Sequence, residues 1–168
     1  MSQKIGQGMI YLAWFLLLAL LTLAANTLLE KQNNPNQNLA SDALNNRMAE
    51  VILEQNRQGH YVATGRINTN KVTFLLDTGA TQISIPEKIA DQLHLKKGYP
   101  LQVMTANGSI TVYSTDLKQV SLGSITLNNL KAHINPYMNG DEILLGMNFM
   151  RHLEIIQRNQ QLSLRHYN

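Results

Sequence analysis

Residues 75–81 read Leu-Leu-Asp-Thr-Gly-Ala-Thr, an apolar run that leads directly into a carboxylate and a glycine turn. The two leucines favour a strand that enters a hydrophobic core, which places Asp77 at the buried end of that strand. A buried carboxylate needs hydrogen-bond partners, because otherwise it takes up a proton. Thr78 can donate from its hydroxyl, and Gly79 permits a sharp turn whose N–H points at the carboxylate.

A single held carboxylate is not yet a catalyst. Hydrolysis of a peptide bond by an activated water needs a base that accepts a proton from the water and an acid that protonates the carbonyl oxygen. Two adjacent carboxylates can fill both roles, since like charges so close cannot both ionise and the pair holds one proton. The chain contains one Asp-Thr-Gly, at 77–79. The second must therefore come from a two-fold related copy, as in a closed symmetric dimer.

Short β patterns and turns surround this stretch from residue 59 onward. Asn107-Gly108 between two β runs is the strongest hairpin signal, and Pro86 at a first helical position predicts a short helix. Strands are predicted at 61–68, 72–76, 82–85, 100–105, 109–114, 120–122, 125–127, 130–134, 143–146, 154–157 and 161–165, and a second short helix is predicted at 147–152. Such a pattern predicts a mostly β fold, a compact barrel of about 110 residues.

An uncharged apolar run at residues 9–29 follows an N-terminal tail at 1–8. Its length as a helix is about 30 Å, the thickness of a bilayer core, so it predicts a transmembrane helix. The alternatives are a cleaved signal peptide, for which the run is long, and a buried helix of a soluble protein. Lys4 before the span favours an N-terminus inside and the rest of the chain outside, which is periplasmic if the source is bacterial.

The segment between this helix and the β region divides into two parts. Residues 30–38 are polar and predict a flexible linker, because they cannot offset their ordering entropy by burial. Residues 39–58 carry apolar side chains at helical spacing and predict an amphipathic stalk helix, with a pro-segment as the alternative. The domain itself is predicted at 59–168.

Composition excludes several other classes of function. The chain has no cysteine, which removes disulfides, thiol catalysis and thiolate metal sites. Its lysines and arginines are scattered, so no nucleic-acid partner is expected. Its five histidines lack metal-binding spacings, so no metal and no cofactor is expected.

The segments at 75–85, 104–112 and 143–150 together resemble a known family, the retropepsins, which are single-lobe aspartic proteases. Residues 75–81 with Ile-Ser-Ile at 83–85 look like the catalytic loop, and Met-Thr-Ala-Asn-Gly-Ser-Ile-Thr-Val at 104–112 is similar to the flap hairpin. Ile-Leu-Leu-Gly-Met-Asn-Phe-Met at 143–150 resembles the segment that supports the catalytic loop, followed by a short helix. The similarity covers residues 59–165 and is greatest to the bacterial, membrane-anchored retropepsin-like group.

The resemblance implies a fold, a reaction and a set of residues. The fold is a single-lobe retropepsin-like closed β-barrel with a flap hairpin, preceded here by the transmembrane helix. The reaction is peptide-bond hydrolysis by a homodimer that acts on peptide or protein substrates. The implied catalytic residues are Asp77, Thr78 and Gly79; the implied substrate-binding residues are Ala80, Thr105, Ala106, Asn107, Gly108 and Ser109; and the implied supports of the site are Leu144, Leu145 and Gly146.

Some features depart from the retroviral pattern, and other interpretations stay open. Met147 stands where retroviral proteases commonly have arginine, so an arginine-mediated dimer contact is missing. Asp77 could instead cap a structural turn or belong to an aspartyl-phosphate motif, although the latter needs an α/β fold. Asp141 and Glu142 could form a second acid pair, but they are expected to be solvated. The alternative function from another class is a non-catalytic peptide-binding or dimerisation module.

Overall fold

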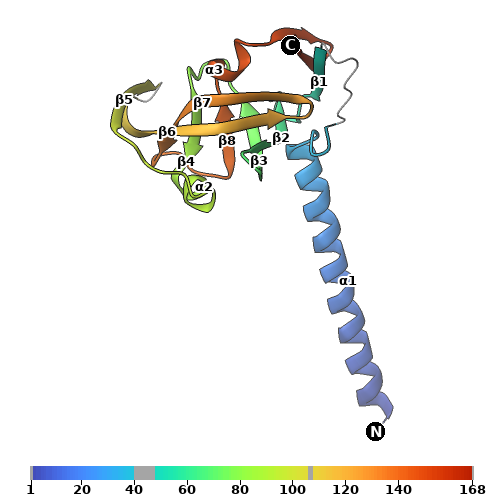
Figure 1. Ribbon diagram of the computed structural model, residues 1–168. Helices are drawn as coiled ribbons and strands as arrows, with labels where there is room; N and C mark the ends of the chain where they lie inside the picture. Colours follow the sequence, from blue (N-terminus) through green and yellow to red (C-terminus); the bar gives the residue numbers. More distant parts are fainter. Residues whose placement is uncertain (1, 40–47, 106–107, 168) are drawn as a thin grey trace.

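A long helix, α1, leads into a β-rich domain with two further short helices (Figure 1). The computed structural model describes residues 2–39, 48–105 and 108–167. The elements in chain order are α1 (Ser2–Asn33), β1 (Met48–Glu54), β2 (Val62–Ile67), β3 (Asn70–Leu76), β4 (Ile83–Pro86), α2 (Glu87–Gln92), β5 (Pro100–Thr105), β6 (Gly108–Leu122), β7 (Ile125–Asn135), β8 (Glu142–Leu145), α3 (Met147–Met150), β9 (Glu154–Arg158) and β10 (Gln161–Tyr167).

The main sheet closes on itself as a barrel. Its strand order is β2-β3-β8-β4-β7-β6-β5, and a further pairing of β2 with β6 closes a ring of six strands that leaves β5 outside. Alternate residues of the strands point into the ring, as the period of two in a strand requires. Phe74, Ile83, Ile134 and Ile143 are among its fully buried side chains. The predicted mostly β closed barrel with short helices is thus confirmed.

Two predicted pairs of short strands are in fact single long strands. β6 joins the predicted strands at 109–114 and 120–122, and β7 joins those at 125–127 and 130–134. The two strands pair with each other from Tyr113↔Ile134 to Leu122↔Ile125. Polar residues around Leu117 in β6 and at 128–129 in β7 interrupt the apolar pattern, but backbone pairing continues past them.

The predicted stalk helix at 39–58 is wrong where the structure describes it. Residues 48–54 form β1, which pairs antiparallel with β10 from Met48↔Tyr167 to Glu54↔Gln161, while residues 40–47 lie outside the described residues. Val51 and Leu53 alternate into the core. The same apolar residues fit a helical spacing locally, and only pairing with a strand more than a hundred residues later in the sequence selects the strand.

The predicted boundaries around α1 also need correction. The helix begins at Ser2 and ends at Asn33, so it includes most of the predicted tail and the start of the predicted linker. Its described side chains between 8 and 33 are exposed. Residues 8–33 are long and apolar enough to cross a membrane, with a mean hydropathy of 2.2.

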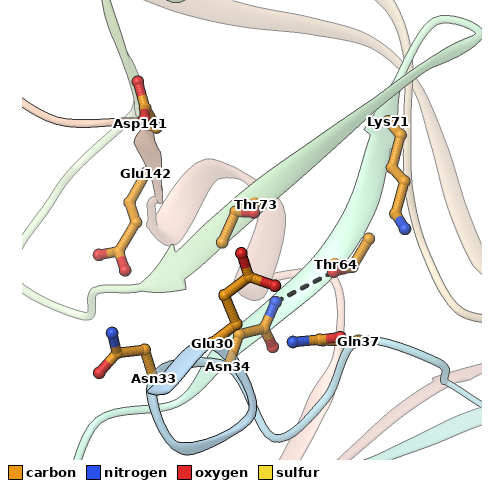
Figure 2. A pocket seen from close by; sticks show the side chains of 9 residues that line it. All are labelled: Glu30, Asn33, Asn34, Gln37, Thr64, Lys71, Thr73, Asp141 and Glu142. Atoms are coloured by element: carbon orange, nitrogen blue, oxygen red, sulfur yellow. Dashed lines mark hydrogen bonds between the residues drawn. The ribbon is translucent and has the colours of Figure 1, made fainter. Parts of the chain in front are cut away.

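The predicted flexible linker at 30–38 is instead held against the barrel. The Asn34 side-chain amide donates to the Thr64 hydroxyl at 3.0 Å, in a hollow where the end of α1 meets β2 and β3 (Figure 2). The Asn36 amide nitrogen donates to the carbonyl oxygens of Glu54 and Val62 at 2.9 and 2.8 Å. The segment has no apolar side chains to bury, which is why a flexible linker was predicted. The hydrogen bonds of Asn34 and Asn36 hold it in place instead.

Candidate active site

The loop at 77–81 begins where β3 leaves the barrel beside the parallel strand β8. Leu75 pairs with Leu144 and Leu76 with Leu145, and the Asp77 N–H continues this ladder by donating to the Leu145 carbonyl at 3.2 Å. Leu145 is fully buried. The position of Asp77 is therefore fixed by the core through the strand that precedes it.

The Asp77 carboxylate lies at the surface of the chain and is oriented by its own turn. Its Oδ1 accepts the Gly79 N–H at 2.8 Å, and its backbone carbonyl accepts the Ala80 N–H at 3.2 Å. Asp77 is partly exposed, and Thr78 and Gly79 are exposed. Within the described part of the chain Asp77 forms no ion pair.

Backbone contacts from the start of α3 hold the far side of the loop. The Met147 N–H donates to the Ala80 carbonyl at 2.8 Å, and the Asn148 N–H donates to the Thr81 carbonyl at 3.1 Å. A Cβ on Gly146 would lie 2.8 Å from the Ala80 carbonyl oxygen and 2.5 Å from that of Gln82. Only glycine allows this approach without displacing the loop. Leu145 and Gly146 therefore contact the loop, and Leu144 pairs with Leu75 of the strand that leads into it.

Asn148 is a structural residue of the site that the sequence analysis did not single out. Its buried side chain accepts the Ile83 N–H at 3.0 Å and donates to the Lys131 carbonyl at 2.6 Å. These bonds connect α3 to β4, which follows the loop, and to β7. An asparagine directly after Gly-Met was a visible signal, but the partners that give it a role lie far away in the sequence.

A cleft of about 540 Å³ opens beside Asp77. Its loop side consists of Asp77, Gly79, Ala80 and Thr81. Its opposite side comes from the β5–β6 hairpin and consists of Leu101, Gln102, Val103, Met104, Thr105 and Ile110. Of the described residues that line the cleft, Asp77 is the only carboxylate.

The hairpin of β5 and β6 occupies the position predicted for the flap. Its strands pair from Pro100↔Tyr113 to Thr105↔Gly108, and the Thr105 hydroxyl donates to the Gly108 carbonyl at 2.8 Å. Thr105 lines the cleft, whereas Gly108 and Ser109 are exposed and are not among its lining residues. Ala106 and Asn107, also predicted to bind substrate, lie outside the described residues.

The back wall of the cleft contains polar groups that the sequence analysis missed. Ser84, His133 and Asn135 line it together with Gln82 and Leu144. Burial lowers the pKa of His133 from its ordinary value. His133 lies between Ala132 and Ile134, so strand alternation directs its side chain away from the core that these two residues enter. Only the closure of the barrel determines that this opposite face borders the cleft.

The other candidate acids lie away from the cleft. Asp141 and Glu142 line the hollow at the end of α1 with Glu30 (Figure 2). Asp141 forms an exposed ion pair with Lys88, at 3.0 Å between Nζ and Oδ1. Among the described residues, no group of three or more histidine, aspartate or glutamate side chains could hold a metal ion.

Comparison with known proteins gives a consistent result. Residues 63–152, which are 90 of the 168, match the family described as gag-polyprotein putative aspartyl protease. The crystal structure of a retropepsin-like aspartic protease from Rickettsia conorii is similar, with a TM-score of 0.62, 28% sequence identity, and coverage of 71% of this chain and 92% of that one.

Two curated relatives also match. An uncharacterized protein in the cobV 5' region of a Sinorhizobium species is 33% identical over 120 residues, which are 69% of this chain and 52% of the relative. The uncharacterized protein RP867 of Rickettsia prowazekii is 28% identical over 123 residues, which are 71% of this chain and 52% of the relative. The chain thus spans about half the length of the curated relatives it matches.

Proposed function

The chain belongs to the gag-polyprotein aspartyl protease family, with a retropepsin-like fold, and from this premise we propose that it is a membrane-anchored aspartic endopeptidase that is active as a homodimer. The observation that carries this proposal is the loop at 77–81. It presents one oriented carboxylate, partly exposed, in a cleft that has no second carboxylate among its described residues. Such a loop supplies one of the two carboxylates that an acid pair needs.

The second half comes from another copy of the chain. A two-fold axis beside Asp77 would bring the two carboxylates together and would cover the exposed Thr78 and Gly79 of each copy. The pair then holds one proton, because two adjacent negative charges repel each other. This arrangement explains why a residue destined for a closed site is partly exposed in the single chain.

Hydrolysis follows from this shared proton. The ionised carboxylate accepts a proton from a water molecule, whose oxygen attacks the peptide carbonyl carbon. The protonated carboxylate donates to the carbonyl oxygen, and the tetrahedral intermediate then collapses with protonation of the leaving amine. An extended peptide would lie in the cleft between the loop and the β5–β6 hairpin, held by strand-like backbone bonds.

The helix α1 supplies the anchor in this proposal. Its apolar part is long enough for a bilayer, and its described side chains contact no core. Lys4 lies before the apolar part, which favours an N-terminus in the cytoplasm and a protease domain on the other side of the membrane. In a bacterium that side is the periplasm.

The decisive experiment compares the detergent-solubilised full chain with its Asp77→Asn variant on a peptide library. Loss of the ionisable carboxylate should reduce cleavage by about 10²–10⁴-fold or more, because the acid–base pair cannot form. Asp141→Asn is the matched control, since Asp141 is exposed and outside the cleft, and it should cleave like the wild type. Equal cleavage by the Asp77→Asn chain would reject the proposal. Peptide binding without any cleavage by the wild type would favour a non-catalytic module.

A further inference from the structure

Three residues from adjacent strands form a row on the cleft side of the barrel. Ser84 of β4 pairs with Leu144 of β8 on one side and with His133 of β7 on the other. The neighbours of each along its own strand belong to the hydrophobic core, so these three side chains point the opposite way. All three line the cleft that contains Asp77.

His133 is the unusual member of this row. The residue is only 8% exposed, yet its imidazole makes no hydrogen bond to any residue that the structure describes. Within that part of the chain, the only fully enclosed side-chain polar atom that lacks a partner is the Tyr61 hydroxyl. The imidazole nitrogens of His133 therefore have access to the cleft. A substrate group that displaces water from these nitrogens must itself supply a hydrogen bond, because an imidazole left unpaired in the closed cleft is costly.

The residues around His133 indicate which kind of substrate group its imidazole can bind. Among the described residues that line the cleft, Asp77 is the only other titratable one. The lowered pKa of His133 means that its imidazole is neutral near pH 7, with one N–H donor and one acceptor nitrogen. Asn135, which also lines the cleft, accepts the Tyr137 N–H with its Oδ1, which leaves its amide N–H groups available as donors.

We propose that His133 is a specificity-determining residue that hydrogen-bonds an uncharged polar side chain of the substrate, that of asparagine, glutamine, serine or threonine. The contacted residue lies near the cleaved bond, because His133 and Asp77 line the same cleft. A substrate carboxylate would be repelled by the negative charge of the Asp77 pair, which lines the same cleft. An apolar side chain would leave the imidazole unpaired. The inference rests on the proposed protease function.

The test uses the full chain in detergent and two peptides that differ at one position. A library first identifies the position with the strongest side-chain preference, and the paired peptides then carry asparagine or the similarly sized leucine there. For the wild type, kcat/KM should favour the asparagine peptide. In His133→Phe this ratio should fall about tenfold, as expected for one lost hydrogen bond, mainly through a higher KM for the asparagine peptide.

His133→Gln keeps a donor and an acceptor and should retain most of the preference. His60→Phe, at an exposed histidine outside the cleft, is the matched control and should leave the ratio unchanged. An unchanged ratio in His133→Phe, or an equal loss in His133→Phe and His133→Gln, would overturn the proposal. If His133→Phe does not fold, His133→Leu replaces it with the same two outcomes.

Failure of this inference is distinguishable from failure of the protease function. The same peptides are tested for binding to the Asp77→Asn chain with and without His133→Phe. A His133-dependent binding preference in a chain whose wild type cleaves nothing would reject the protease and support the polar contact. Cleavage by the wild type without any His133-dependent preference would support the protease function and reject the polar contact.

Discussion

At the scale of single residues, the site depends on close backbone packing around Gly146. The atoms nearest to a Cβ at this position are the Gln82 carbonyl oxygen and carbon, at 2.5 and 2.6 Å, and the Ala80 carbonyl oxygen at 2.8 Å. All of them belong to the backbone of the loop that carries Asp77 or of the segment that follows it. They cannot rotate away as a flexible side chain would, so any added carbon must push the loop.

Gly146→Ala should therefore destabilise the fold and impair the site together. The expected loss of stability is about 1–3 kcal/mol, the usual cost of overpacking, and a displaced Asp77 should lower kcat/KM as well. Gly8→Ala is the control, because a Cβ there meets nothing within 4 Å. Thermal unfolding and peptide cleavage measure the two effects. Wild-type values for both in Gly146→Ala would show that the loop tolerates the shift.

At the scale of elements, β1 and the segment after α1 are joined by one side chain. Asn36 accepts the Glu54 N–H at 2.8 Å and donates to carbonyls at the end of β1 and the start of β2. The Thr64 N–H donates to the Asn36 carbonyl at 3.1 Å, as in a short parallel bridge. The end of α1 is thus attached directly to the barrel, from which the helix projects (Figure 1).

If α1 is a membrane anchor, the chain should resist alkaline carbonate washing of membranes and be released by detergent. Leu18→Lys with Leu21→Lys should move it to the soluble fraction, since each lysine near the centre of a span costs about 2.5–3.5 kcal/mol. Leu18→Met with Leu21→Met is the control and should stay in the membrane. A mature chain whose mass shows removal of residues 9–29 would identify the helix as a signal peptide instead.

At the scale of the whole molecule, a single chain forms a closed barrel, whereas its candidate active site is open at the surface. The barrel has its own core, with fully buried side chains such as Phe74 and Phe149. The loop of Asp77 lies at its surface, and β5 lies outside the ring of six strands. A second copy would complete the acid pair without any change to the core.

A shared site predicts that specific activity falls when the solubilised chain is diluted, because the dimers dissociate by mass action. Addition of excess Asp77→Asn chain at a fixed wild-type concentration should lower activity further, since mixed dimers contain one carboxylate instead of two. Both assays use the same peptide and a constant detergent concentration. Activity per chain that is independent of dilution and unaffected by the variant would contradict the shared site.

The mostly β barrel and the placement of most strands followed from local signals. The apolar run before Asp77, the Asn107-Gly108 dipeptide and the apolar run before Gly146 each carry their information within a few neighbouring residues. Alternation along a strand and the conformations allowed to glycine and asparagine are local properties, so they are visible before folding. The long apolar helix was predicted for the same reason.

Other features depended on pairings between distant segments. Residues 48–54 became a strand only because β10 lies beside them, and the polar segment after α1 became ordered because Asn34 and Asn36 met the barrel. His133 entered the wall of the cleft when β4 and β7 paired in register. A residue's own neighbours in sequence determine its backbone preference, but its partners across the barrel determine which surface it faces. The amino-acid sequence alone therefore indicated the loop of Asp77, and the tertiary structure alone decided what surrounds it.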